Sequence, residues 1–142
     1  MTNALFDPAR EGFLDGTIDW DTAVIKVALV RGYTFSASHK FVSDITGASG
    51  VLVATSGALA SKTVTNGVAD AADITFTSVT STAVNHSLLV YQSSAVTGGS
   101  DVAASAQRVI AWIDSGTNLP AVPNGGDITV AWDSGANKIF KL

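Results

Sequence analysis

Apolar and polar residues alternate along much of the chain with the two-residue period of β-strands. In residues 22–30, for example, Ala23, Ile25, Val27 and Leu29 fall on one face and the residues between them fall on the other. The stretches with a strand-like pattern are 22–30, 51–54, 61–65, 72–79, 87–92, 108–114, 128–133 and 138–142. The pattern therefore predicts eight or nine short strands.

Turn residues separate these stretches. Asn66-Gly67 is the dipeptide typical of a two-residue β-hairpin. Residues 133–137 (DSGAN) predict another turn, after which residues 138–142 return beside 128–133 as a C-terminal β-hairpin. Residues 93–106 are rich in Ser, Ala and Gly, and we expect them to form an exposed loop.

A short repeat connects two of the predicted strands. Residues 111–116 (AWIDSG) resemble residues 131–135 (AWDSG), which indicates two strands that both end in an Asp-Ser-Gly turn. The apolar neighbours of Trp112 and Trp132 favour a place in the core for both rings.

Helical signals are few. Asp7 before Pro8 is typical of a helix N-cap followed by proline, and Gly12 or Gly16 would end this helix after one or two turns. A second short helix is predicted over residues 38–45, with Ser38 as its cap. The fold class expected is all-β: a single-domain jelly roll or β-sandwich with at most one or two short helices.

No linker divides the chain, and we expect an N-terminal arm over residues 1–16 and one β domain over 17–142. The apolar residues of the arm lie either over the edge of the core or against a neighbouring subunit. Together with Trp20, whose place relative to the core the pattern leaves open, they form the set of candidate interface residues: Leu5, Phe6, Phe13, Leu14 and Trp20. If the arm docks outside the domain, deleting residues 2–12 leaves the fold intact.

Composition excludes several classes of protein. Charged residues are 14% of the 142, against an average near a quarter, and the net charge of −4 argues against nucleic-acid binding. The chain has no cysteine, which excludes disulfides, zinc fingers, iron–sulfur clusters and a thiol nucleophile. No apolar run is long enough to span a membrane, and no signal peptide is visible at the start.

Residues that carry chemistry are scattered. His39 and His86 are far apart and have no partner at a metal-ligand spacing, and the acidic cluster around Trp20 lacks the pattern of a calcium loop. Asp70 and Asp73 offer a carboxylate pair for a hydrolase, but an Asp-rich chain offers many such pairs. The sequence therefore predicts no catalytic, cofactor-binding or metal-binding residues, and a structural or binding protein.

The C-terminal half resembles small virion proteins of tailed phages. The residues that carry the resemblance are 62–76 (KTVTNGVADAADITF), 88–91 (LLVY), 119–133 (LPAVPNGGDITVAWD) and 135–140 (GANKIF). The family most similar is the capsid cement, or decoration, protein of a Bordetella phage and its relatives.

The resemblance implies a non-enzymatic jelly-roll protein made in the bacterial host cytoplasm, dimeric, and located in the virion. There it would bind the outer surface of an icosahedral head and stabilise contacts between major capsid subunits. An acidic domain suits this outer surface, away from packaged DNA. The alternative is a phage tail-associated adhesin or carbohydrate-binding module, with Trp20 or Tyr33 as a sugar platform.

Overall fold

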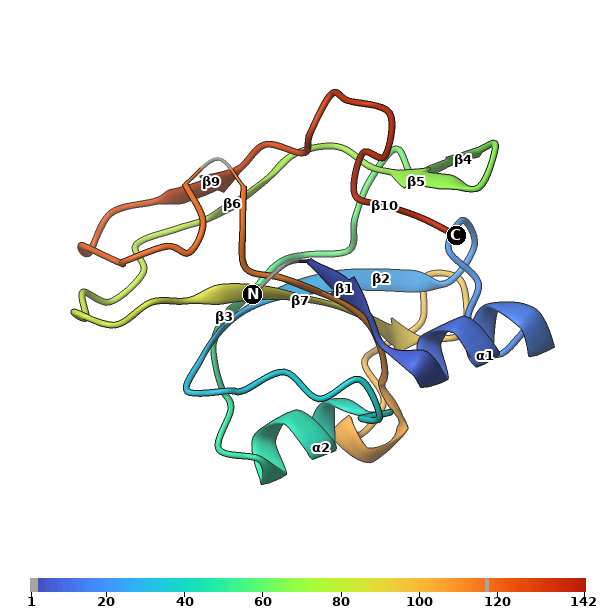
Figure 1. The fold of residues 1–142 in the computed structure, drawn as a ribbon, viewed down its shortest axis with the longest axis horizontal. Coiled ribbons are helices and arrows are strands. Elements are labelled where there is room, and N and C mark those ends of the chain that lie inside the picture. Colours follow the sequence, from blue (N-terminus) through green and yellow to red (C-terminus); the bar gives the residue numbers. More distant parts are fainter. Residues whose placement is uncertain (1–2, 117) are drawn as a thin grey trace.

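The computed structural model describes residues 3–116 and 118–142 and shows β-strands in two layers (Figure 1). In these residues ten strands form three antiparallel sheets, with two short α-helices and one 3-10 turn. The elements are β1 (Ala4–Leu5), α1 (Asp7–Asp15), β2 (Val24–Arg31), α2 (Val42–Gly47), β3 (Val51–Thr55), β4 (Thr63–Thr65), β5 (Val68–Asp70), β6 (Ile74–Phe76), β7 (Ser87–Ser94), the 3-10 turn (Ala104–Ala106), β8 (Arg108–Ile113), β9 (Ile128–Val130) and β10 (Phe140–Lys141). The predicted all-β single-domain fold is confirmed, and the two strands that the pattern missed are β1 and β5.

A five-stranded sheet, in the order β1-β8-β7-β2-β3, forms the centre of the molecule. The small sheets cover one face of it and α2 lies across the other (Figure 1). Strand β8 is buried throughout and β7 is buried from Leu88 onward, as expected of central strands. In β2 the alternation is incomplete, because Val24 and Ala28 are as buried as Ile25 and Val27. A strand covered on both faces has no solvent side to keep polar.

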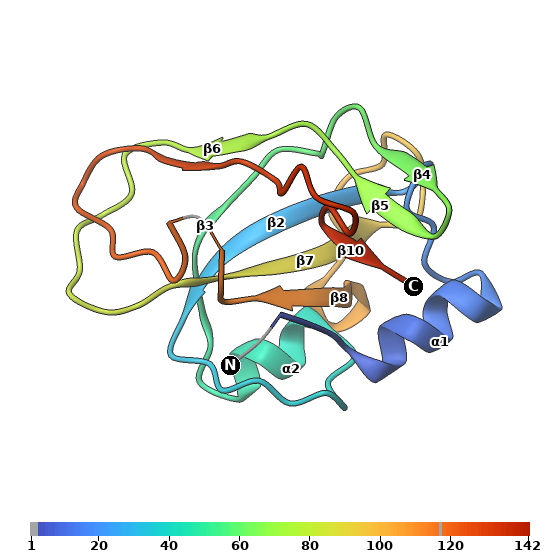
Figure 2. The ribbon, with the colours of Figure 1, turned by 45° about the horizontal axis from the view of Figure 1, so that its top comes forward.

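The second layer holds a three-stranded sheet, β10-β5-β4, and a two-stranded sheet, β6-β9 (Figure 2). The hairpin at Asn66-Gly67 is confirmed: it joins β4 to β5, and both turn residues have positive φ (54° and 78°), as a type I′ turn requires. The predicted loop is exposed from Ala95 to Ala106, whereas Ser93 and Ser94 are buried at the end of β7.

The predicted C-terminal hairpin is wrong. Strand β9 pairs with β6, and β10 pairs with β5. The turn after β9 is held locally, since the Asp133 carboxylate accepts the N–H of Gly135 at 3.0 Å. Ile139 and Phe140 are both buried, and the Ile139 N–H donates to the carbonyl of Ala69. Burying this apolar pair against β5 therefore determines where the last strand lies.

The segment expected to be an N-terminal arm is packed into the domain. Strand β1 extends the five-stranded sheet beside β8, and Phe6 and Ala9 have no exposed surface. The buried Arg108 guanidinium donates to the Pro8 carbonyl at 2.6 Å and to the Thr17 hydroxyl at 2.8 Å. The Arg108 side chain therefore links β8 to the first turn of α1 and to the segment just after the helix.

Both helices are placed slightly differently from the prediction. The N-cap of α1 is Phe6, not Asp7, and Gly16, in the left-handed region (φ 80°), ends the helix. Helix α2 begins four residues after Ser38, which does not cap it. Instead the Asp44 carboxylate accepts the backbone N–H groups of Lys40 and Phe41, both at 2.9 Å.

Candidate functional site

An apolar groove of about 380 Å³ lies where α1, the loop after it, the β4–β5 hairpin and the C-terminus meet. These segments lie side by side at one end of the molecule in both ribbon views (Figures 1 and 2). The groove is lined by Phe13, Gly16, Ile18, Asp19, Trp20, Asp21, Val64, Gly67, Ala69, Phe140 and Leu142. It brings together two of the five candidate interface residues, Phe13 and Trp20.

Trp20 forms the inner wall of the groove. Only 4% of the residue is exposed, and its ring packs edge-on against Phe140 with 5.2 Å between centroids. The indole N–H donates to the carbonyl of Asp70 at 3.3 Å. The preceding Asp19 carboxylate accepts the backbone N–H of Asp21 and both the N–H and the hydroxyl of Thr22. Trp20 is therefore a fixed part of the core that also lines the groove.

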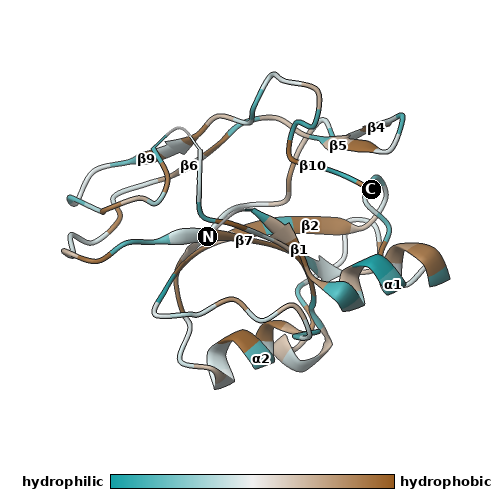
Figure 3. Cartoon of the chain, in the orientation of Figure 1, coloured by the Kyte–Doolittle hydropathy of each residue, from teal (hydrophilic) through white to brown (hydrophobic). Residues whose placement is uncertain are grey.

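Two exposed apolar side chains line this groove, Val64 and Leu142, and a third, Leu14, follows the groove residue Phe13 in the chain. Leu14 is 89% exposed, and Val64 and Leu142 are each 57% exposed. Hydrophobic colouring marks the end of α1 that carries Leu14 (Figure 3). Apolar side chains gathered on a surface are typical of contacts with another molecule.

The five candidate interface residues therefore differ in what they can offer to a partner. Leu5, Phe6 and Trp20 belong to the core. For Leu5 and Phe6 this agrees with the expectation that the apolar residues of the arm pack on the core and not on a neighbouring subunit. Phe13 is half-buried and packs on the Phe140 ring, with 5.7 Å between centroids. Leu14 alone presents nearly its whole side chain to solvent.

The aromatic platform that the sugar-binding alternative requires is not exposed. Trp20 is buried, as described above. The Tyr33 ring is half-buried edge-on against Trp112, at 4.9 Å between centroids. Its hydroxyl is hydrogen-bonded to His39 Nδ1 at 2.8 Å, and the same surroundings raise the pKa of the phenol by burial. The Trp20 ring therefore has almost no exposed surface, whereas the Tyr33 ring keeps part of its surface exposed.

The remaining chemistry-bearing residues serve the fold. His86 is fully buried and is bonded through Nδ1 to the carbonyl of Val84 at 2.8 Å, while its Nε2 is buried without a hydrogen-bond partner among the described residues. Asp70 pairs with Lys138 at 3.3 Å, and the Asp73 carboxylate accepts the N–H of Trp132 at 2.9 Å. Among residues 3–116 and 118–142, no group of three or more His, Asp or Glu side chains is placed to hold a metal ion. No helix in the same residues is long and apolar enough to cross a membrane.

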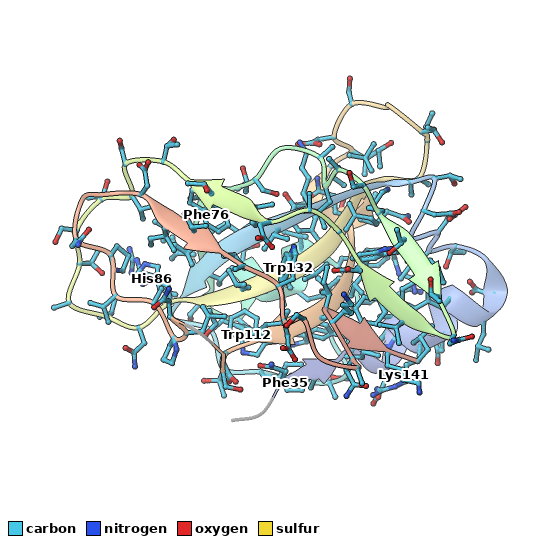
Figure 4. The ribbon with its side chains drawn as sticks, turned by 90° about the horizontal axis from the view of Figure 1, so that it is seen from above. Phe35, Phe76, His86, Trp112, Trp132 and Lys141 are labelled. Carbon is cyan, nitrogen blue, oxygen red and sulfur yellow. The ribbon has the colours of Figure 1, made fainter. Side chains whose placement is uncertain are left out.

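A larger cleft, of about 840 Å³, opens between β8 and the segment after β9. The two tryptophans of the sequence repeat, Trp112 and Trp132, both line this cleft (Figure 4). Trp112 is buried as predicted, whereas Trp132 is only half-buried, with its indole N–H donating to the carbonyl of Ala72 at 3.0 Å. The cleft itself was not predicted, since it depends on how β8 and the segment after β9, which are distant in the sequence, are placed relative to each other.

The hydrogen bonds that several aspartate side chains accept should make the stability of the fold sensitive to acid. Four aspartates accept hydrogen bonds that favour the charged carboxylate and so lower their pKa below the ordinary 3.8: Asp15, Asp19, Asp44 and Asp101. A pKa that is lower in the folded than in the unfolded chain stabilises the fold above the unfolded value, and this stability is lost as the pH falls through the folded value. We expect the free energy of unfolding, measured by urea titration, to fall steadily below about pH 4.

The matched variant for this prediction is Asp19→Asn, which keeps the shape of the side chain and removes its titration. For Asp19 the hydroxyl of Thr22 is the main cause of the lowered pKa. The variant should be less stable than the wild type at neutral pH and should lose less stability on acidification. An equal loss in both proteins would show that Asp19 does not contribute.

The fold and the groove define a class: an all-β, two-layered protein with an apolar groove at one end. Compared with known proteins, the chain matches no protein-family model and none of the curated proteins.

Proposed function

We propose that this chain is a non-enzymatic virion structural protein, a capsid cement or decoration protein of a tailed phage. In this proposal it binds the outer surface of the icosahedral head and stabilises the contacts between major capsid subunits. Because the protein binds only the assembled shell, the free energy of each contact stabilises that shell. Many copies add their contributions. The resemblance of residues 62–76, 88–91, 119–133 and 135–140 to such proteins supports this function.

The observation that carries the proposal is the apolar end of the molecule. Val64 and Leu142 line the groove and are largely exposed, and Leu14, next to the groove residue Phe13 in the chain, is more exposed still. Of these, we assign Leu14 to contact with the head, because it is the most exposed of the three and lies in the last turn of α1. The net charge of −4 is compatible with a surface that never meets packaged DNA.

Immunogold labelling of intact phage particles tests the location. We expect antibodies against this chain to label the head. Labelling of the tail would overturn the proposal in favour of the adhesin alternative. Particles without any label would overturn both.

Leu14→Ser tests the contact itself. Burial of a leucine side chain stabilises a contact by about 1.5–3 kcal/mol, so the variant should bind heads that lack the protein about 10- to 100-fold more weakly. Val96→Ser is the matched control, because Val96 is 68% exposed in the loop after β7. Equal binding by both variants in a sedimentation assay would remove Leu14 from the interface.

A further inference from the structure

The larger cleft, between β8 and the segment after β9, has the make-up of a ligand site. Its volume of about 840 Å³ falls within the range of about 300–1,000 Å³ that is usual for small-molecule sites. Its inner wall includes the buried side chains of Leu88 and Trp112. The polar side chains that line it, called the rim below, are Arg10, Asp133, Ser134, Asn137, Lys138 and Lys141. An apolar wall with a few polar groups around it can hold a ligand and orient it.

Trp132 gives this cleft an aromatic ring whose position is fixed. Its backbone N–H donates to the Asp73 carboxylate at 2.9 Å, and its indole N–H donates to the carbonyl of Ala72 at 3.0 Å. The ring is only half-buried, whereas Trp112 is 4% exposed and packs edge-on against Tyr33. Because both N–H groups of Trp132 are used within the chain, the ring offers a ligand its apolar surface. A ring already held in place loses little conformational entropy when a ligand stacks on it.

The rim offers both donors and acceptors of hydrogen bonds. Ser134 and Asn137 are exposed, and within the described residues neither side chain has a hydrogen-bond partner. A serine hydroxyl and an asparagine amide each donate and accept. These two side chains can therefore bind groups that are themselves both donors and acceptors.

The charges of the rim are balanced. Two of its three cations, Arg10 and Lys138, are paired at 3.0 Å and 3.3 Å with carboxylates that do not line the cleft. The two other charged side chains, Asp133 and Lys141, have opposite signs. The rim therefore has no excess of charge that would select an ionic ligand. Hydroxyl groups, which donate and accept and carry no charge, match it best.

We propose that this cleft binds a neutral oligosaccharide, with one sugar ring stacked on Trp132 and hydroxyl groups hydrogen-bonded to Ser134 and Asn137. A sugar ring has a face of C–H groups and an edge of hydroxyls, so it fits an aromatic surface that lies beside donors and acceptors. The site is separate from Trp20 and Tyr33, the platforms expected from the sequence. On a head-bound protein it is a second function, the capture of glycans outside the particle.

A peptide is a poorer occupant of the cleft. Strands β1 and β10 are outermost in their sheets and both border the cleft, but each is only two residues long. Such short edges offer too few backbone groups to add a strand of peptide. An amphipathic helix needs a groove that is apolar along its length, whereas the rim of this cleft is polar.

Nuclear magnetic resonance of the wild-type chain tests the proposal through the indole N–H signals of its three tryptophans. We expect at least one of maltotriose, cellotriose and N-acetylchitotriose to shift the Trp132 signal most. The signal of Trp20, which lies in the other groove, should not move. Trp132→Phe assigns the signal by removing it. Tetra-alanine at the same concentration is the control ligand and should move none of the three signals.

Three results of this titration overturn the proposal. The first is that none of the trisaccharides moves the Trp132 signal. The second is that only the Trp20 signal moves, which places the sugar in the other groove. The third is that tetra-alanine moves the Trp132 signal as much as a trisaccharide, which makes the cleft a peptide site. Because the isolated chain is used, each result is independent of where the chain lies in the particle.

Asn137→Ala tests the rim without disturbing the core, because Asn137 is exposed. The variant should bind the trisaccharide about 2- to 10-fold more weakly, the usual effect of losing one hydrogen-bonding side chain. Asn85→Ala is the matched control, since Asn85 is also exposed but does not line the cleft, and it should bind as tightly as the wild type. Equal affinity of the two variants would overturn the hydrogen bond assigned to Asn137.

Discussion

Phe6→Ala should destabilise the protein by about 3–5 kcal/mol, the usual effect of emptying a fully buried phenylalanine site. Phe6 has no exposed surface, and its ring packs on Phe35 with 5.0 Å between centroids. Its backbone N–H donates to the carbonyl of Ile110 on β8 at 3.1 Å, which holds the residue at the junction of β1 and α1. Thermal unfolding should show a fall in melting temperature of about 10–20 °C.

The matched control is Leu14→Ala on the same N-terminal segment. Because Leu14 is 89% exposed, this truncation should change the free energy of unfolding by no more than about 0.5 kcal/mol. Deletion of residues 2–12, which would leave the fold intact if the arm docked outside the domain, should instead prevent stable folding, because it removes β1, Phe6 and Ala9. A deletion variant that melts like the wild type would show that the segment is dispensable.

The strands of the main sheet could be predicted because their signal is local. Strands β7 and β8 are dense apolar runs, and the Asn66-Gly67 turn imposes its own backbone geometry. Such features depend on neighbours in the sequence alone. The all-β class follows from them directly.

What could not be predicted is the choice of partners distant in the sequence. The hydropathy pattern of residues 128–142 is compatible with a local hairpin, yet β9 and β10 pair with strands that lie more than fifty residues earlier. The decisive contribution is burial of Ile139 and Phe140, which requires the shape of the whole core. The N-terminal segment differs from the prediction for the same reason, since the binding site for Phe6 exists only once β8 and the 32–41 segment are in place.

The candidate site was anticipated in part. Phe13 and Trp20 were selected as apolar residues without an assigned place, and both line the groove. Val64 was not selected, because alternation within a predicted strand gave it no special status. Its exposure and its open edge depend on β4 being the last strand of its sheet, which is a property of topology.

Trp20→Ala should produce a loss of stability of similar size, about 3–5 kcal/mol. The substitution removes the edge-on contact with Phe140, the hydrogen bond to the Asp70 carbonyl and the inner wall of the groove at once. The part-buried carbonyl of Asp70 then loses this donor, which adds to the effect of the cavity. Urea-induced unfolding followed by circular dichroism measures the change, because the signal does not depend on the tryptophan that is removed.

Trp20→Phe separates the two contributions. Phenylalanine keeps an aromatic ring against Phe140 but has no N–H for the carbonyl of Asp70, so the loss should be smaller, about 1–3 kcal/mol. A side chain that served only as a surface platform would behave differently, because its truncation would leave the free energy of unfolding unchanged within about 0.5 kcal/mol. Stability that is unaffected by Trp20→Ala would therefore contradict the core position of this ring and restore it as a binding residue.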